Sequence, residues 1–142
     1  MDYFKVMVTG NNEGIIWDTA KEIELESDHI AFQYLSREID ISEWKNLYLD
    51  LFKKWLVDDD DSIYEITNSI NMKMIDALVI INSETSDFRL YYWFDVDRDK
   101  YPNYVWKKCP LAGTDLIDLP EHYNNNNRKI SVNYPLVFPL GQ

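Results

Sequence analysis

The chain has 142 residues, of which 46% are hydrophobic and 15% aromatic, and its formal net charge is -11. This size fits one compact domain with a core of its own, and the hydrophobic content excludes the disordered class of chains. Asp and Glu outnumber Lys and Arg by 25 to 14, a balance that repels phosphate backbones and anionic membranes but attracts basic surfaces. The composition therefore predicts one domain, residues 1–142, that binds neither nucleic acid nor a membrane directly.

Cysteine usage and the N-terminal sequence both favour a reducing compartment. The single cysteine, Cys109, cannot close an internal disulfide, and no base that would activate it stands nearby in the sequence. The N-terminus has no basic region followed by an apolar run, and no segment approaches the roughly 20 continuous apolar residues of a membrane span. We expect a cytoplasmic protein in which Cys109 is a structural or incidental thiol.

The first predicted elements are two strands. Residues 3–9 carry β-type residues in alternation and end at a turn over residues 10–12. Residues 21–27 place Ile23 and Leu25 on one side and glutamates on the other, which is typical of a half-buried strand. Together they predict an N-terminal antiparallel hairpin.

A long helix follows. Apolar residues recur at 44, 47, 48, 51, 52, 55 and 56, a spacing that forms one broad helical face. Asp40 is placed to cap the first turn with Glu43 reaching back to it, and Ile39 can pack on Trp44 as a hydrophobic staple. The sequence predicts a helix that starts near Asp40.

Acidic residues stand where this helix ends, although the negative end of a helix disfavours anions. The run comprises Asp58, Asp59, Asp60 and Asp61. Ser62 and Glu65 have the spacing of a capping box, and acids just before a helix favour its positive end. We therefore expect a second, shorter helix over residues 62–70.

The next segments read as strands. Residues 72–82 form a nearly continuous apolar run of strand length, which predicts a central strand covered on both faces, and residues 83–87 form its turn. Residues 88–97 alternate. Phe88, Leu90, Tyr92, Phe94 and Val96 share one side, and Arg89, Tyr91, Trp93, Asp95, Asp97 and Asp99 share the other.

The C-terminal third offers shorter patterns. Residues 103–109 and, after the asparagine run at 124–127, residues 128–134 read as further strands. Prolines interrupt the remainder, so the last ten residues are expected on the surface or along an edge. The fold class is α+β: an antiparallel β-sheet with one long and one short α-helix packed on one face.

Alternate aspartates imitate the opening of a calcium loop. With Asp95 as the first position of such a loop, the sixth would be Gly and the twelfth a bidentate Glu, but Lys100 and Trp106 stand there. The pattern therefore excludes an EF-hand and leaves only a looser divalent-ion site open at Asp95, Asp97 and Asp99.

Enzyme chemistry has one weak candidate. Asp95 and Asp97 beside aromatic rings are the composition of a carbohydrate hydrolase, but neighbours on one strand face would be solvated, whereas a general acid needs burial. The chain has no nucleophile elbow, no zinc-ligand spacing and no phosphate-binding loop. We expect a protein without a cofactor that is not an enzyme, with a carboxylate-dependent hydrolase as the alternative.

Recognition of a basic protein is the function that this composition favours. The even-numbered side of residues 88–97 is the more hydrophobic one, so it should face the core. The rings and carboxylates of the odd-numbered side would then be exposed to solvent. The reverse arrangement, with the odd-numbered side covered by a helix, stays open. The predicted partner-binding residues are Asp58, Asp59, Asp60, Asp61 and Glu65 for steering, Tyr91 and Trp93 for anchoring, and Asp95, Asp97 and Asp99 for steering.

A short, acidic, aromatic-rich α+β domain without a cofactor resembles the immunity proteins of bacterial toxin systems. The resemblance implies tight binding to a cognate toxin, for example a basic nuclease, by direct contact. Two alternatives of other kinds remain: an inhibitor that mimics DNA, which predicts carboxylates spaced like phosphates, and a regulatory or structural binding domain.

Overall fold

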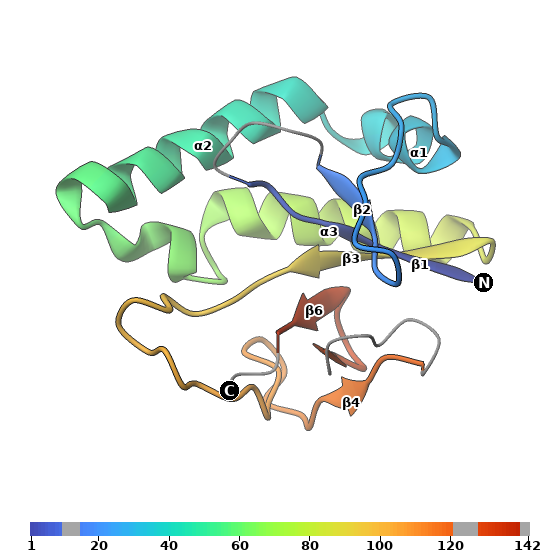
Figure 1. The fold of residues 1–142 in the computed structure, drawn as a ribbon. Helices are drawn as coiled ribbons and strands as arrows, with labels where there is room; N and C mark the ends of the chain where they lie inside the picture. Colours follow the sequence, from blue (N-terminus) through green and yellow to red (C-terminus); the bar gives the residue numbers. More distant parts are fainter. Residues whose placement is uncertain (10–14, 121–127, 140–142) are drawn as a thin grey trace.

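The computed structural model describes residues 1–9, 15–120 and 128–139. These ranges exclude the turn expected at residues 10–12 and the asparagine run at 124–127. The strands are β1 (Asp2–Val6), β2 (Ile16–Asp18), β3 (Phe88–Trp93), β4 (Ile117–Asp118), β5 (Lys129–Ile130) and β6 (Leu136–Phe138), and the helices are α1 (Ile30–Glu38), α2 (Ile41–Asp58), the 3-10 helix η1 (Asp61–Tyr64) and α3 (Ser69–Glu84) (Figure 1). The class is α+β.

The sheet is mixed, which corrects the antiparallel sheet expected from the sequence. Its strand order is β2-β1-β3-β6-β5-β4. Strand β3 pairs with β1 and with β6 in parallel, whereas the other neighbouring pairs are antiparallel. Helices between β2 and β3 return the chain to the end of the sheet where β1 begins, so β3 runs in the same direction as β1.

The N-terminal hairpin forms, but with a different second strand. Strand β2 pairs with β1, and residues 21–27 contribute only one bridge, between Trp17 and Glu24. Asp18 accepts hydrogen bonds from the backbone of Ala20 and Lys21, so the chain turns directly after β2. Ile23 is consequently 56% exposed, and the strand predicted over residues 21–27 is wrong.

Helix α2 confirms the helix predicted from residue 40. The Asp40 side chain caps it by accepting the backbone N–H of Glu43 at 3.0 Å. Trp44 and Leu51 are buried on its inner face. The Trp44 indole also donates to the Ile70 carbonyl at 2.9 Å and so ties α2 to α3.

Residues 72–82 are helical, and the central strand predicted there is wrong. They belong to α3, which Asn68 caps through the backbone N–H of Ile70. The buried residues of α3 include Asn71, Met74, Ile75, Leu78 and Ile81, whose spacing is that of one helical face, whereas Val79 and Ile80 are exposed. The helical periodicity was not visible in the sequence, because the exposed side of the helix carries aliphatic residues too and the apolar run is nearly continuous.

The short helix predicted over residues 62–70 is also corrected. Only η1 forms there, and Asp60 rather than Ser62 caps it, through the backbone N–H of Ser62 at 2.9 Å. The next helix begins at Ser69. The sequence also gave no indication of α1, which His29 caps through the backbone N–H of Ala31.

The helices pack on the side of the sheet that carries the even-numbered residues of β3. Phe88 contacts Tyr34 of α1, and Tyr92 contacts Trp44 of α2. The Tyr92 hydroxyl donates to the Asn71 side chain of α3 at 2.6 Å. Phe88, Leu90, Tyr92 and Phe94 are all buried. The prediction that the even-numbered side chains face the core is therefore confirmed from Phe88 to Phe94.

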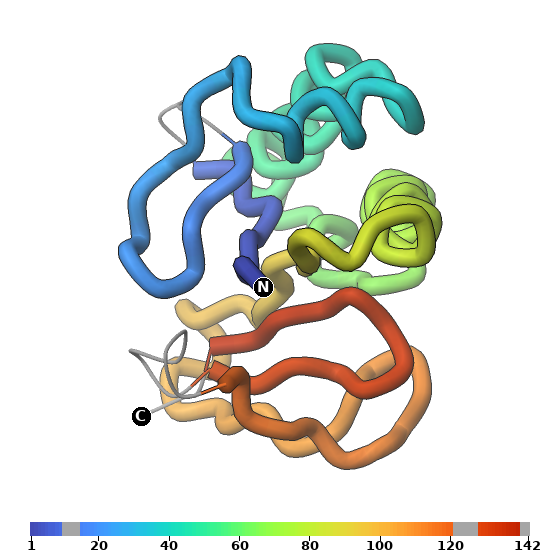
Figure 2. Tube along the Cα trace, turned by 90° about the vertical axis from the view of Figure 1, so that its right-hand side faces the viewer, coloured from blue at the N-terminus to red at the C-terminus, as the bar shows by residue number. Residues whose placement is uncertain are grey.

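The C-terminal third supplies the other half of the sheet, as the orange and red part of Figure 2 shows. Strand β6 lies inside the sheet between β3 and β5 and is fully buried, so the expectation that the last ten residues follow the surface or an edge is wrong for residues 136–138; residues 140–142 lie outside the described ranges. The predicted strand over 128–134 shrinks to β5, and residues 103–109 form only one bridge, between Lys108 and Asp115. Among the described residues, no helix combines the length and apolar character needed to cross a membrane.

Candidate functional site

Two acidic segments far apart in the sequence meet at one end of the molecule. Lys100, in the segment after β3, donates to Asp61 at 2.7 Å and lies 3.8 Å from Asp59. The indole of Trp55, in the last turns of α2, donates to Asp97 at 3.0 Å. We call the acidic end the region formed by Asp58, Asp59, Asp60, Asp61, Glu65, Asp95, Asp97 and Asp99, which adjoins the C-terminus of α2 (Figure 1).

The aspartate run after α2 reverses the chain. Asp59 ends the helix with a left-handed backbone, φ 54°, and Asp60 then caps η1. Hydrogen bonds from the Ser62 hydroxyl and backbone lower the pKa of Asp60, and the hydrogen bond to Asp61 raises the pKa of Lys100. Asp58, Asp59 and Asp61 remain exposed, as does Glu65 after η1. Asp60 therefore caps η1, and the other carboxylates of this segment are displayed at the surface.

Asp95 has a structural role. Arg98 donates a hydrogen bond to each of its two oxygens, at 2.8 Å in both cases. The Trp106 indole and the backbone N–H of Val96 donate to the same carboxylate. Arg98 also donates to the carbonyl of Tyr104 at 2.7 Å. Asp95 thus folds the segment after β3 back on itself, and it is not the freely displayed carboxylate that the alternation predicted.

Asp97 differs from its neighbours because it is buried, with only 5% of its surface exposed. Its oxygens accept hydrogen bonds from the Trp55 indole and from the backbone of Asp99, both at 3.0 Å. Strand β3 ends at Trp93, so the alternation does not continue to residue 97. Of the three aspartates predicted to face solvent, only Asp99 is exposed.

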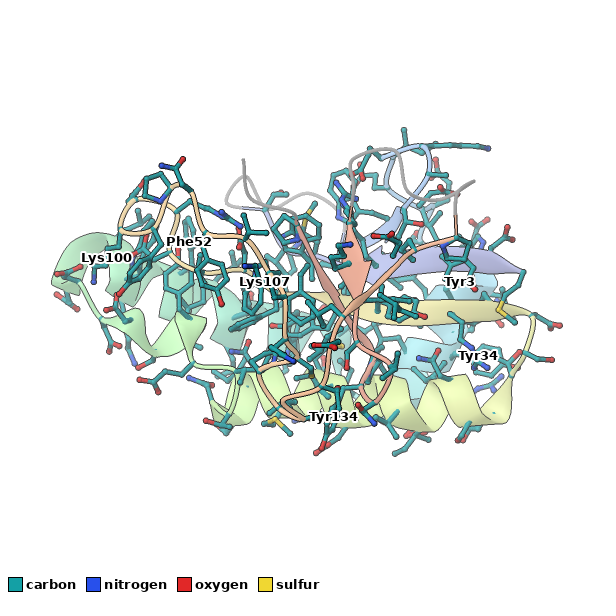
Figure 3. All side chains as sticks on the ribbon, turned by 90° about the horizontal axis from the view of Figure 1, so that it is seen from below. Tyr3, Tyr34, Phe52, Lys100, Lys107 and Tyr134 are labelled. Atoms are coloured by element: carbon teal, nitrogen blue, oxygen red, sulfur yellow. The ribbon has the colours of Figure 1, made fainter. Side chains whose placement is uncertain are left out.

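Tyr91 and Trp93 do not form the displayed anchors that the sequence predicted. Both are half-buried and pack with Tyr3 against a small second core formed by Leu119, Ile130 and Val137. Tyr91 stacks on Tyr3 with the ring centroids 6.0 Å apart. In Figure 3, Tyr3 lies at the opposite end of the molecule from Lys100. Tyr91 is therefore not part of the acidic end.

Cations cover Trp93 on the side of the sheet away from the helices. Lys5 lies 4.4 Å and Arg128 4.7 Å from the centre of its ring. Glu22 forms ion pairs with both cations, at 2.7 Å with Lys5. Burial lowers the pKa of Lys5 to about 8, although the hydrogen bond to Glu22 raises it. This cluster braces the sheet and covers one side of the Trp93 ring.

Sequence reasoning missed the aromatic side chains that the acidic end does display. Tyr101 is 58% exposed and Tyr104 41%, and both follow Asp99 in the segment that Lys100 ties to Asp61. The sequence held an indication of this, because Pro102 and Asn103 stand between the two tyrosines and are typical of a turn. Rings in a turn cannot share a strand's buried face.

A pocket of about 290 Å³ opens beside these residues. It lies beyond the carboxyl ends of the parallel strands β1 and β3, the usual position of ligand sites in open sheets with parallel strands. Residues 7–9 and 93–99 form part of its lining, together with Tyr48, Phe52 and Trp55 of α2 and Ile63 and Tyr64 of η1. The pocket thus joins aromatic walls to the carboxylates of the acidic end.

Two tyrosine hydroxyls in this lining make no hydrogen bond within the described part of the chain. They belong to Tyr48 and Tyr64. Burial raises the pKa of Tyr48 to about 12. Burial and then the negative charge of Asp97 raise the pKa of Tyr64. Both hydroxyls therefore stay neutral at physiological pH and can each donate and accept a hydrogen bond.

The donor set at this end does not point to a metal centre. In residues 1–9, 15–120 and 128–139, no group of three His, Cys, Asp or Glu side chains is placed to hold an ion.

Comparison of the chain with family models, curated proteins and solved structures found no match.

Proposed function

We propose that this protein is a non-enzymatic binding protein that receives a basic protein partner on its acidic end. The observation that supports the proposal most directly is the convergence of two acidic segments, which Lys100 joins through Asp59 and Asp61. Carboxylates on one end of a molecule with a net charge of -11 form a field that speeds encounter with a cationic surface. Exposed Tyr101 and Tyr104 stand beside them, and tyrosine is among the residues that contribute most to binding energy.

The class of partner follows from the resemblance to immunity proteins. We propose a bacterial toxin, such as a basic nuclease, that this protein neutralises by direct binding in the cytoplasm. Tight neutralisation needs fast association, which the carboxylates supply, and slow dissociation, which buried aromatic contacts supply. In this proposal Asp58, Asp59, Asp61, Glu65 and Asp99 steer the partner. Tyr101 and Tyr104 replace Tyr91 and Trp93 as the anchors.

Hydrolysis of carbohydrate is the weaker alternative. Two catalytic carboxyl groups must both face the scissile bond. The bidentate ion pair with Arg98 and the hydrogen bond from Trp106 occupy Asp95, which favours a structural role for it over proton transfer. Binding therefore accounts for more of the geometry than catalysis does.

Capture of the partner from cells of the source organism tests the proposal. Immobilised protein should retain a basic protein, and retention should fall steeply as salt rises because exposed charges are screened beyond roughly 10 Å at 0.1 M salt. The double variant Asp58→Asn/Asp99→Asn should slow association, and Tyr101→Ala/Tyr104→Ala should speed dissociation. The matched control, Glu84→Gln/Asp87→Asn, removes the same charge at the opposite end of β3 and should change neither rate.

The outcomes separate the alternatives. Retention of no basic protein, or retention that salt and the acidic-end variants leave unchanged, contradicts the proposal. Duplex DNA that competes for a captured DNA-binding protein supports the DNA-mimic alternative instead. Release of reducing sugar from a polysaccharide panel, lost in Asp97→Asn, supports the hydrolase alternative.

A further inference from the structure

Asp97 is a buried carboxylate without an ion pair, and the charge of Lys100 acts on it only from beyond ion-pair distance. It is 5% exposed, and no lysine, arginine or histidine nitrogen of the described chain lies within ion-pair distance of it. Its neighbour Asp95 is more exposed and yet has a bidentate arginine. Burying a carboxylate is costly unless it is paired and hydrogen-bonded. Within the described residues, the more buried of the two acids therefore has hydrogen bonds but no ion pair.

The acceptor capacity of Asp97 is only partly used. An ionised carboxylate offers about four lone-pair sites. The Trp55 indole takes one site on Oδ2, and the backbone of Asp99 takes one on Oδ1. Asp97 is also part of the lining of the pocket beside α2. Its remaining sites are therefore available to a donor that enters this pocket.

The walls of the pocket restrict what that donor can be. Carboxylates of Asp97 and Asp99 repel anions, and the rings of Phe52, Trp55 and Tyr64 present surfaces that a cation can stack on. The rings are packed against one another, with Trp55 lying 5.7 Å from Phe52 and 5.6 Å from Tyr64 between centroids. At about 290 Å³ the pocket lies at the lower limit of ligand sites, roughly 300–1,000 Å³, and so suits one side chain.

We propose that this pocket binds the guanidinium group of an arginine side chain that the basic partner inserts, with Asp97 as its counter-ion. This inference rests on the proposed function and names what the acidic end recognises. A guanidinium is planar and carries five N–H donors in a fixed fork. It can pair with Asp97, reach the free hydroxyls of Tyr48 and Tyr64, and stack on a ring at the same time. A lysine ammonium is a compact point charge with three donors and cannot stack in this way.

Titration with a small probe tests the pocket without the partner. The probe is N-acetyl-arginine N-methylamide, followed by its lysine analogue and its neutral citrulline analogue, and the readout is the NMR signal of the Trp55 indole N–H. The arginine probe should shift this signal saturably with a dissociation constant on the order of 1 mM. The lysine analogue should bind at least threefold more weakly, and the citrulline analogue should show no saturable shift.

Two variants and one control assign the binding to the pocket. Asp97→Asn should weaken the arginine probe at least tenfold, because it removes the counter-ion and keeps an acceptor for Trp55. Phe52→Leu removes a ring and keeps every carboxylate, and it should weaken binding about threefold, which covers the case in which Asp97→Asn fails to fold. Asp87→Asn removes one charge at the opposite end of β3, outside both the acidic end and the pocket lining, and should leave the constant within twofold.

The result that overturns the inference is specific to it. Absence of a saturable shift, equal binding of the citrulline analogue, or an unchanged constant in folded Asp97→Asn each rules out an arginine pocket. Salt-sensitive capture of a basic protein can still succeed in that case, and the acidic end then binds through its exposed surface alone. Saturable arginine binding without any captured basic protein instead contradicts the proposed function, while the assignment of an arginine pocket stands.

Discussion

The Tyr92 hydroxyl shows how one buried polar contact connects sheet and helix. It donates to the side-chain oxygen of Asn71 at 2.6 Å, and the Asn71 amide donates to the carbonyls of Ile63 and Glu65. Both side chains are buried, and burial raises the pKa of Tyr92 far above its usual value. Asn71 therefore connects α3 to η1 and the residue after it, and Tyr92 connects Asn71 to the sheet.

Replacing Tyr92 with Phe should destabilise the protein by about 1–3 kcal/mol, because the Asn71 oxygen is then left buried without a donor. The measurement is urea unfolding followed by tryptophan fluorescence. Tyr91→Phe is the matched control on the other side of β3, where the hydroxyl makes no hydrogen bond within the described residues, and it should change the free energy of unfolding by less than about 0.5 kcal/mol. Equal effects of the two variants would contradict the role given to the hydroxyl.

Lys5 predicts a pH dependence of stability. Its pKa is about 8 in the folded protein and 10.5 in an unfolded chain, because burial disfavours the charged form next to Arg128 despite the hydrogen bond to Glu22. Between these two values the unfolded chain binds more protons, so stability contributed by Lys5 rises with pH and is lowest below pH 8. Tyr48 and Tyr91, with pKa values raised to about 12 by burial, act in the opposite direction only above about pH 10.

Comparison with Lys5→Met isolates this contribution. The free energy of unfolding of the wild type minus that of the variant should increase by about 1–2 kcal/mol between about pH 8 and pH 9.5. Urea unfolding at several pH values at constant ionic strength measures it. A difference that stays flat across this range would show that Lys5 does not titrate there.

At the scale of elements, the end of α2 is a place where the proposed binding would act against stability. Asp59 has a left-handed backbone and lies at the negative end of the helix, and both features are unfavourable for an aspartate. Its side chain is 82% exposed and 3.8 Å from Lys100. Under the proposed function, Asp59 extends the acidic end at a cost to the stability of its own helix.

Asp59→Gly should therefore stabilise the protein and weaken its binding to the partner. Glycine adopts positive φ without strain and removes the anion, which together should raise the free energy of unfolding by roughly 1 kcal/mol. Thermal unfolding measures the gain, and the association rate with the captured partner should fall. Asp87→Gly, directly before the start of β3, serves as a control. Destabilisation by Asp59→Gly would contradict this account of the helix end.

The elements also show which sequence patterns are reliable. Helix α2 has an apolar face at regular helical spacing and a capping aspartate, and both predictions are confirmed because they depend on residues within a few positions of one another. Residues 72–82 are apolar almost throughout, so periodicity could not separate a buried helix from a buried strand. Asn68, which caps α3, was the overlooked local indication.

At the scale of the molecule, β6 decides the topology. Leu136 is fully buried between β3 and β5 although prolines flank the strand at 135 and 139. The prolines are tolerated because the strand is only three residues long and the carbonyl of Pro135 still accepts the backbone N–H of Tyr92. The sequence suggested a surface tail because proline is normally excluded from a central strand.

Leu136→Ala should cost about 2–5 kcal/mol, because it opens a cavity in the main core. Val132→Ala, four residues earlier and 57% exposed, should cost less than about 0.5 kcal/mol. Thermal and urea unfolding of both variants provide the measurement. A small effect of Leu136→Ala would mean that the last strand is dispensable, as expected of a tail on the surface.

The sequence by itself determined the α+β class, the capped helix α2 and the inward side of β3, because each depends on contacts between near neighbours in the chain. Only the tertiary structure decided that β1, β3 and β6 run parallel and that β6 enters the sheet. The same packing brings residues 58–61 to residues 95–101 and buries Asp97 against Trp55. Pairing between distant segments depends on the packing of the whole core, and a local pattern of side chains does not encode it.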